Sequence, residues 1–207
     1  MTSLTPENKF RSAAVVTRTI RFLCLIIMVS SGCGDSGGEA PFEGLASVVF
    51  DIDGTLTTGI GALDFFLPRP DAAEAVQLYV EKGYGVIYLT ARPWFLRDFT
   101  QRWLSQNGFP DLPLYLAEEI LLDTPDRTVA YKLQVLRDLT VEEDRKFLYG
   151  YGDSSTDFDA YNQAGIPVSR TFALLRRGET DCEEGLYEAC LPGYTEHLAY
   201  IEDQPNR

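Results

Sequence analysis

Basic residues are scarce in this sequence. Its 207 residues include 18 lysines and arginines against 31 aspartates and glutamates, which gives a formal net charge of −13 at pH 7. Proteins that bind nucleic acids obtain most of their affinity from lysine and arginine contacts with phosphates. The negative net charge therefore argues against a nucleic-acid partner. It also would not favour binding to an anionic membrane surface. With 45% hydrophobic residues, the composition is that of an ordinary globular domain.

A hydrophobic run long enough to span a membrane is also lacking near the N-terminus. The apolar stretch Phe22–Val29, which follows several basic residues, is too short for an ordinary span and fits the core of a signal peptide. Small residues and Cys33 follow, and this arrangement resembles the cleavage box of bacterial lipoproteins, whose cysteine is lipidated. We therefore expect a lipoprotein signal peptide over residues 1–32, a Gly-rich flexible tether over 33–44 and the folded domain over 45–207.

These features of the N-terminus predict a location outside the cytoplasm. The lipoprotein interpretation predicts a protein of the bacterial cell envelope, on the periplasmic side, anchored to a membrane through lipid on Cys33. Ordinary signal cleavage, which would give a soluble periplasmic or secreted protein, and an uncleaved anchor are the alternatives.

Cysteine and histidine are sparse as well. Of the four cysteines, Cys182 and Cys190 lie in the predicted domain, and in an oxidising compartment we expect them to form a disulfide near the C-terminus. Two free buried thiols are the alternative. His197, the single histidine, is expected on the surface of a helix.

The most informative motif is a short strand that ends in two carboxylates. The apolar run Val48–Phe50 is typical of a buried parallel strand, and Asp51 and Asp53 follow it. Strand alternation turns both carboxylates the same way, and ligands of open parallel sheets bind outside the carboxyl ends of the strands. Two anions this close need an ion pair or a metal, and hard oxygen ligands suit Mg²⁺. A plain polar turn or a calcium loop is the alternative.

Strands alternate with helices along the rest of the chain, which predicts an α/β domain with a parallel sheet covered on both faces. Further strands are predicted over residues 86–90, 114–117, 147–151 and 168–174. Helices are predicted to start near Asp71, Pro93, Thr124 and Ser154, with a last one over 196–202. With the strand before Asp51, the sheet has five strands, and no segment is long enough for a large cap domain.

The segment Asp51–Thr57, Asp-Ile-Asp-Gly-Thr-Leu-Thr, resembles the first motif of the haloacid dehalogenase-like (HAD) phosphotransferase superfamily. Its second threonine resembles the lipin-type phosphatidate phosphatases. The resemblance implies a three-layer, Rossmann-like fold with the strand before Asp51 at its centre. Leu89–Arg92 resembles a Leu-Ser-Ala-Arg stretch of lipin-like enzymes, which implies that Thr90 binds phosphate. Arg92 is expected to contact the substrate, or alternatively to form an ion pair at a helix start.

The same resemblance implies a lysine that steadies the phosphate. Lys132 lies one helix before the fourth predicted strand, where the superfamily places this residue, and its ammonium would neutralise charge on the transferring phosphoryl group. The alternative for Lys132 is a solvated helix lysine. Lys146 is a rival, but it comes just before the entry end of that strand.

A further motif, Gly152–Asp157, follows the fourth predicted strand. Asp153 is expected to meet Asp51 and Asp53 at the carboxyl ends of the strands, so that the three carboxylates bind Mg²⁺. Asp157 is expected to support this site from behind the metal ligands. Alternatively its carboxylate serves the helix, because Ser154-x-x-Asp157 is a capping box.

These roles predict a magnesium-dependent phosphomonoesterase. Asp51 would attack phosphorus and form an aspartyl-phosphate, while Asp53 would protonate the leaving oxygen and then activate water. The expected substrate is a membrane lipid phosphate such as phosphatidate, because the domain is expected at a membrane and no large cap closes the site. The alternatives are a broad-specificity periplasmic phosphatase of small phosphomonoesters and a catalytically silent lipid-binding domain.

Overall fold

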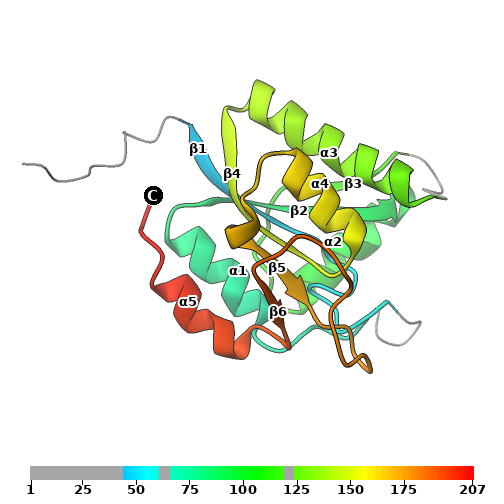
Figure 1. The fold of residues 1–207 in the computed structure, drawn as a ribbon, viewed down its shortest axis with the longest axis vertical. Helices are drawn as coiled ribbons and strands as arrows, with labels where there is room; N and C mark the ends of the chain where they lie inside the picture. The colour runs from blue at the N-terminus through cyan, green and yellow to red at the C-terminus, as the bar shows by residue number, and fades with distance from the viewer. Residues whose placement is uncertain (1–43, 61–65, 119–123) are drawn as a thin grey trace, which may run out of the picture. The chain divides into compact units, whose positions relative to one another are not determined.

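The computed structural model describes residues 44–60, 66–118 and 124–207. Within them, six parallel strands form one sheet in the order β3-β2-β1-β4-β5-β6 (Figure 1). The strands are β1 (Leu45–Phe50), β2 (Gly85–Pro93), β3 (Leu114–Ala117), β4 (Arg145–Gly152), β5 (Thr171–Leu174) and β6 (Ala189–Leu191). β1 lies inside the sheet between β2 and β4, so the predicted parallel α/β architecture is confirmed.

Helices cover both faces of the sheet. They are α1 (Ala72–Glu81), α2 (Arg97–Gln106), α3 (Pro125–Glu142), α4 (Ser155–Gln163) and α5 (Leu198–Glu202). Alternate residues of β1 serve the two faces: Val48 and Phe50 pack in a cluster with α1, α2 and α5, whereas Val49 packs in a second cluster with α3 and α4. This period-two burial makes β1 the middle of three layers.

The sheet has six strands rather than the five that the sequence predicts. β6 pairs in parallel with β5, from Phe172 opposite Ala189 to Leu174 opposite Leu191. A strand of three residues is too short to show an alternating pattern, and its pairing comes from tertiary packing. The sulfur atoms of Cys182 and Cys190 are bonded, which ties this strand to the preceding loop.

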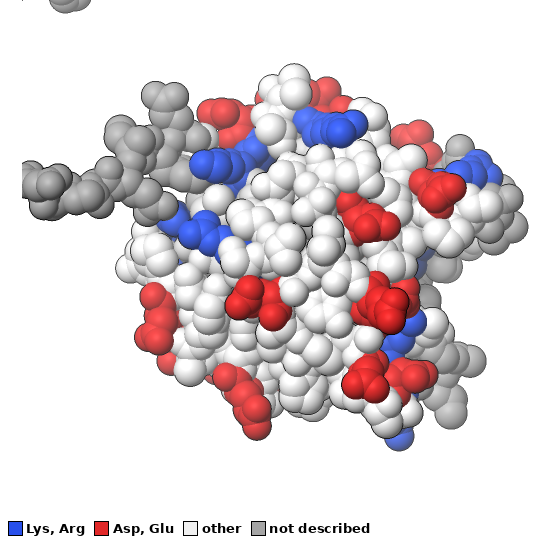
Figure 2. Space-filling view, viewed as in Figure 1, with Lys and Arg blue, Asp and Glu red and all other residues white. Residues whose placement is uncertain are grey.

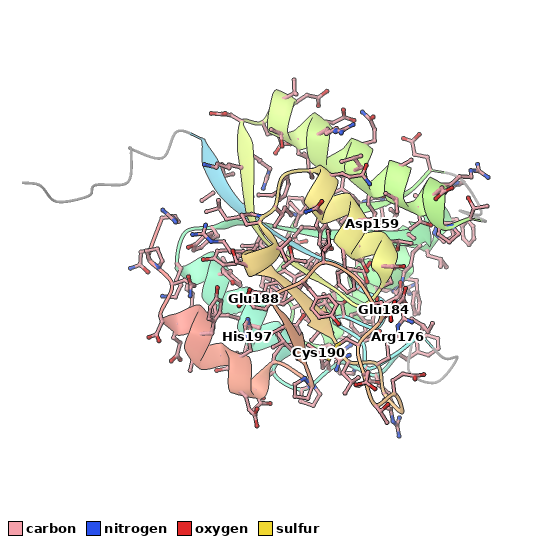
Figure 3. All side chains as sticks on the ribbon, viewed as in Figure 1. Asp159, Arg176, Glu184, Glu188, Cys190 and His197 are labelled. Atoms are coloured by element: carbon pink, nitrogen blue, oxygen red, sulfur yellow. A yellow bond between two sulfur atoms is a disulfide. The ribbon has the colours of Figure 1, made fainter. Side chains whose placement is uncertain are left out.

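His197 is buried, and the expectation of a surface position is wrong. It is labelled in Figure 3 and lies in the 3₁₀ turn η4 (Thr195–His197) at 7% exposure. Its ring stacks on that of Tyr200. Its Nε2 lies 3.0 Å from the hydroxyl of Tyr151, which is 2.8 Å from that of Tyr79. Burial lowers the pKa of His197 to about 4. One turn of helix has too little periodicity to reveal its buried side.

The predicted signal peptide, the tether through residue 43 and Cys33 lie outside the described residues. In the part of the chain that the structure describes, no helix has the length and hydrophobicity required to cross a membrane.

Candidate active site

Asp51 and Asp153 meet where β1 and β4 end. The backbone N–H of Asp51 donates to the carbonyl of Tyr151 at 2.9 Å, which continues the pairing of the two strands as far as the carboxylates. Both aspartates are 3% exposed. Gly54, at φ +75°, turns the chain against Asp153, where an added Cβ would lie 1.9 Å from Oδ2. Glycine is therefore required at this turn for both steric and conformational reasons.

Asp51, Asp153 and Asp157 form a buried acidic cluster. Each offers one carboxylate oxygen, and these oxygens lie within 4.8 Å of one another. Burial raises the pKa of Asp51 well above its usual value, with Lys132 opposing this and the other acids adding to it. Burial and the charge of Asp157 raise the pKa of Asp153 to about 7. Hard oxygen donors whose charges repel at this separation fit a divalent cation such as Mg²⁺.

Lys132 reaches this cluster from α3. Thr124 is the N-cap of this helix, and its hydroxyl accepts a hydrogen bond from the N–H of Arg127. The helix buries one face against the sheet. Lys132 is 3% exposed, and its Nζ lies 2.7 Å from Oδ1 of Asp51 and 2.5 Å from Oδ1 of Asp157. Burial alone would lower the pKa of this lysine, but Asp157 and Asp51 outweigh burial and raise it. The lysine is therefore charged and is not a solvated surface residue.

The carboxylate of Asp53 does not join the acidic cluster. It accepts a hydrogen bond from Oγ1 of Thr90 at 3.1 Å, and Nη2 of Arg92 lies 2.7 Å from its Oδ1. Arg92 is itself held by Thr100 at 3.2 Å. The sequence placed Asp53 with Asp51 and Asp153 as a metal ligand, whereas the structure brings Asp157 into that set. Thr90 and Arg92 instead fix Asp53 beside the cluster, with its side chain 24% exposed.

The sequence left open whether Asp157 supports the metal ligands from behind or caps a helix; its carboxylate caps α4 and also lies among the candidate metal ligands themselves. Its Oδ2 accepts hydrogen bonds from the N–H of Ser154 at 3.2 Å and from the Ser154 hydroxyl at 2.8 Å, which forms the capping box at the start of α4. Its Oδ1 forms an ion pair with Nζ of Lys132. One carboxylate thus links the helix start to the acidic cluster.

Arg176, which follows β5, was not identified as a site residue from the sequence. Arg176, which is labelled in Figure 3, pairs through its Nε with Oδ2 of Asp153, and its Nη1 lies 3.0 Å from Glu183. Glu183 also accepts from the N–H of Ser155 at 2.9 Å and from the Ser155 hydroxyl at 2.6 Å. The signal that could have found Arg176 is the Arg-Arg pair after the last predicted strand. Glu183 has no such signal, since its position depends on the loop closed by the disulfide.

Arg69 is a second residue that sequence reasoning missed. It is 6% exposed, and its guanidinium donates to four backbone carbonyls. These belong to Gly54 at 2.6 Å, Leu175 at 3.0 Å, Thr55 at 3.1 Å and Pro192 at 3.1 Å. Arg69 therefore ties the turn after Asp51 to the C-terminal segment. A single arginine in a Pro-rich loop gives no sign of this role.

Comparison with known proteins identifies relatives for most of the chain. Residues 48–175 match the model of the PITM 1-3, LNS2 domain family. The mouse membrane-associated phosphatidylinositol transfer protein 3 is 29% identical over 164 residues, which cover 77% of this chain and 16% of that protein. The phosphatidic acid phosphohydrolase 1 of Saccharomyces cerevisiae is 29% identical over 189 residues, which cover 75% of this chain and 21% of that protein. The chain thus spans less than a quarter of the length of either relative.

Solved structures agree on the fold. A D,D-heptose 1,7-bisphosphate phosphatase from B. bronchiseptica, complexed with magnesium and phosphate, superposes with a TM-score of 0.53 at 16% identity. The match covers 75% of this chain and 99% of that one. At this identity the likeness concerns the fold, which is that of HAD-like phosphatases.

The expected location in a bacterial cell envelope is wrong. The matched relatives are eukaryotic proteins from mouse and yeast, not proteins of a bacterial envelope. Basic residues before a short apolar run are found in many N-terminal segments, so this pattern identifies neither a kingdom nor a compartment. The family model matches more than half of the chain, and the fold carries the expected carboxylates. The chain therefore belongs to the LNS2 domain family.

Proposed function

We propose that this chain is a magnesium-dependent phosphomonoesterase that acts through an aspartyl-phosphate on a lipid phosphate such as phosphatidate. The observation that carries the proposal is the contact between Lys132 and Asp51, 2.7 Å long and buried, with Asp53 fixed nearby by Thr90 and Arg92. A nucleophile, a charge that stabilises the transferring group and a candidate acid–base thus occupy one end of the sheet.

The chemistry assigned to the chain's own residues follows from these positions. Asp51 attacks phosphorus, and the bond to the leaving oxygen breaks as that oxygen takes a proton from Asp53. Asp53 then removes a proton from the water that attacks the aspartyl-phosphate, which releases phosphate and restores Asp51. Lys132 steadies negative charge on the phosphoryl oxygens throughout. Arg92 and Thr90 hold the Asp53 carboxylate in its orientation.

The buried carboxylates of Asp51, Asp153 and Asp157 are the residues that would hold Mg²⁺. The raised pKa values of Asp51 and Asp153 and the mutual separation of the three carboxylates support this assignment. When bound, the ion would neutralise charge on the phosphoryl group.

Two observations support a lipid substrate. The yeast relative is named as a phosphatidic acid phosphohydrolase. In addition, exposed apolar side chains lie after the first two motif strands: Phe66 at 50%, Leu67 at 43%, Trp94 at 56% and Phe95 at 54% exposure. Acidic side chains are spread over the face shown in Figure 2, so contact with a lipid would depend on such apolar groups more than on charge. The same acidity supports the absence of a nucleic-acid partner.

A second candidate is a domain that binds lipid phosphate without hydrolysing it. The family model and the mouse relative favour it, because that relative is named as a phosphatidylinositol transfer protein rather than a phosphatase. The presence of both Asp51 and Asp53 favours turnover.

The deciding experiment measures phosphate release from phosphatidate vesicles and from a soluble aryl phosphate, with Mg²⁺ and with a chelator. Asp51→Asn is the matched inactive variant, since an amide cannot form the acyl-phosphate. Release from both substrates that requires Mg²⁺ and Asp51 would support the phosphatase. Vesicle binding with no release from either substrate would put the binding domain in its place. Release from the aryl phosphate alone would overturn the lipid substrate and leave a phosphatase of small phosphomonoesters.

A further inference from the structure

The carboxylate of Glu183 links Arg176 to the start of α4. Its Oε2 lies 3.0 Å from Nη1 of Arg176, and its Oε1 accepts hydrogen bonds from the N–H of Ser155 at 2.9 Å and from the Ser155 hydroxyl at 2.6 Å. The Nε side of the guanidinium pairs with Oδ2 of Asp153. Arg176 therefore lies between two carboxylates, one that is a candidate metal ligand and one that is not.

Glu183 belongs to a short loop that a disulfide closes. The bond between Cys182 and Cys190 joins the residue beside Glu183 to β6, eight residues further along the chain. Residues 183–188, all of which the structure describes, form neither helix nor strand. Without the crosslink, fixing this irregular loop would cost more conformational entropy. Cys190, which is labelled in Figure 3, is exposed, so the bond is open to a dissolved reductant.

Glu183 carries a negative charge that balances Arg176. Burial favours the neutral form of this carboxyl, but the hydrogen bonds from Ser155 and the charge of Arg176 outweigh burial and lower the pKa of Glu183. A guanidinium with Asp153 as its single partner would direct its full charge at the metal ligands. The ion pair with Glu183 offsets that charge, because opposite charges in contact largely cancel at a third site.

We propose that Glu183 is a positioning residue of the metal site, which offsets the charge of Arg176 and so lets a cation take the carboxylate of Asp153. The disulfide beside Glu183 holds it in this role, so the affinity for Mg²⁺ depends on the oxidation state of the two cysteines. The inference rests on the magnesium site of the proposed function. Glu183 itself contacts neither the metal nor the substrate in this assignment.

The redox step is an ordinary thiol–disulfide exchange. A small dithiol gives two electrons and two protons to the disulfide, whose cysteines become thiols, and the dithiol closes to its own cyclic disulfide. In the reduced protein the loop has lost its crosslink, so Glu183 is no longer fixed and Arg176 retains Asp153 as its partner. Mg²⁺ then competes with a guanidinium whose charge Glu183 no longer offsets. Reduction is therefore expected to weaken Mg²⁺ binding.

The first test is calorimetric titration of the metal-free protein with Mg²⁺. Glu183→Gln keeps an oxygen that can accept from Ser155 and removes the charge, so the dissociation constant should rise by about three- to tenfold. Glu184→Gln, the same change at the adjacent exposed position, should leave it within about twofold because solvent screens that charge. An unchanged dissociation constant in Glu183→Gln would overturn the inference.

A double-mutant cycle separates this role from other effects of the substitution. In an Arg176→Gln background there is no guanidinium charge to offset, so adding Glu183→Gln should change the dissociation constant by less than about twofold. A merely structural role, or direct attraction of the cation by Glu183, would give the same loss in both backgrounds and would overturn the inference. Urea unfolding of each variant reports whether the domain remains folded.

The disulfide is tested by titration with Mg²⁺ before and after treatment with dithiothreitol. Reduction should raise the dissociation constant to near that of Glu183→Gln. The variant Cys182→Ser/Cys190→Ser should bind Mg²⁺ as weakly and should not respond to the reductant; the other cysteines are common to both proteins. A bond that only stabilises the fold would lower the midpoint of urea unfolding on reduction and leave Mg²⁺ affinity unchanged, which would overturn the redox dependence.

These outcomes differ from a failure of the proposed function. Mg²⁺ binding that follows the expected pattern without any phosphate release would support the role of Glu183 and reject the hydrolysis. An absence of Mg²⁺ binding by the wild-type protein would reject the metal site and the inference with it. Phosphate release that requires Mg²⁺, together with an unchanged dissociation constant in Glu183→Gln, would reject the inference alone.

Discussion

The ammonium of Lys132 and the carboxylate of Asp51 lie 2.7 Å apart, and both side chains are almost wholly buried. This contact joins residues that are far apart in the sequence, one after β1 and one in the middle of α3. Because a second carboxylate, Asp157, also binds the same ammonium, the lysine is fixed before any substrate arrives. Such prior placement of charge is the main way in which enzymes stabilise transferring groups.

Replacing this lysine should damage stability and activity together. Lys132→Met leaves Asp51 and Asp157 buried without their cation, and breaking such a pair typically costs about 3–5 kcal/mol of folding free energy. We also expect kcat to fall by about 10²- to 10³-fold on any phosphomonoester. Urea unfolding and phosphate release measure the two effects. Lys146→Met, an exposed lysine at the start of β4, should change neither, and equal behaviour of the two variants would contradict the assignment of Lys132.

The two aspartates of the first motif should differ in their response to the leaving group. Asp51→Asn should abolish turnover of every substrate. Asp53→Asn should slow an alkyl lipid phosphate by about 10²- to 10⁴-fold, the usual contribution of general acid–base catalysis, and an aryl phosphate much less. The aryl oxygen leaves with little protonation, which explains the difference. Steady-state rates on both substrates provide the measurement, and equal losses in Asp53→Asn would show that this residue has another role.

The native Arg176 side chain is expected to weaken the binding of Mg²⁺. Its guanidinium pairs with Oδ2 of Asp153, so it competes with a cation for that carboxylate. Arg176→Gln is therefore expected to tighten Mg²⁺ binding by about three- to tenfold, as expected for removing one nearby like charge at roughly 1 kcal/mol. Calorimetric titration of the protein with Mg²⁺ measures this, and Arg177→Gln is the neighbouring control. Weaker binding in Arg176→Gln would instead mean that the arginine organises the carboxylates.

Acid should destabilise the protein partly through His197. Its pKa is about 4 in the folded protein and near 6.5 when unfolded, so the unfolded chain binds the extra proton first. The contribution of neutral His197 to the free energy of unfolding is therefore complete above pH 6.5 and is lost as the pH falls towards 4. Between pH 7 and pH 5 the loss should be about 1–2 kcal/mol, the lower figure allowing for solvent screening.

The matched variant for this effect is His197→Phe, which keeps a ring against Tyr200 and removes the titrating group. Unfolding by urea at pH 7 and at pH 5 gives the stability of each protein. The wild type should lose more stability than the variant over this interval, because the carboxylates shared by both cancel in the comparison. Parallel losses in the two proteins would show that His197 does not titrate as described.

Much of the fold follows from local patterns in the sequence. The apolar run before Asp51 predicts the strand because its residues must bury both faces, and Val48 and Val49 do belong to opposite clusters. The start of α3 is visible as Thr124 followed by Pro125, a cap and a residue with a preset φ. β6 and η4 were not foreseen correctly, because elements of three residues have no period of their own and depend on packing.

The residues of the candidate site could likewise be predicted only in part. Residues at or near the carboxyl ends of strands, such as Asp51, Thr90 and Asp153, could be predicted to gather because parallel strands end together. The direction of each carboxylate could not, since it depends on which cation lies nearest in three dimensions. Arg92 draws the Asp53 carboxylate aside, and Lys132 brings Asp157 to the cluster. Contacts such as these exist only once the helices are packed.

The position of β6 affects how a truncated fragment of this protein would behave. The family match ends at residue 175, one residue after β5, whereas β6 and α5 come later in the chain. A fragment cut at that boundary would leave β5 as an unpaired sheet edge, with a row of free N–H and C=O groups that recruit strands from other molecules. It would also lose Arg176 and the pairing of that arginine with Asp153. Self-association of such a fragment would therefore reflect the missing margin of the sheet and not an intrinsic oligomeric state.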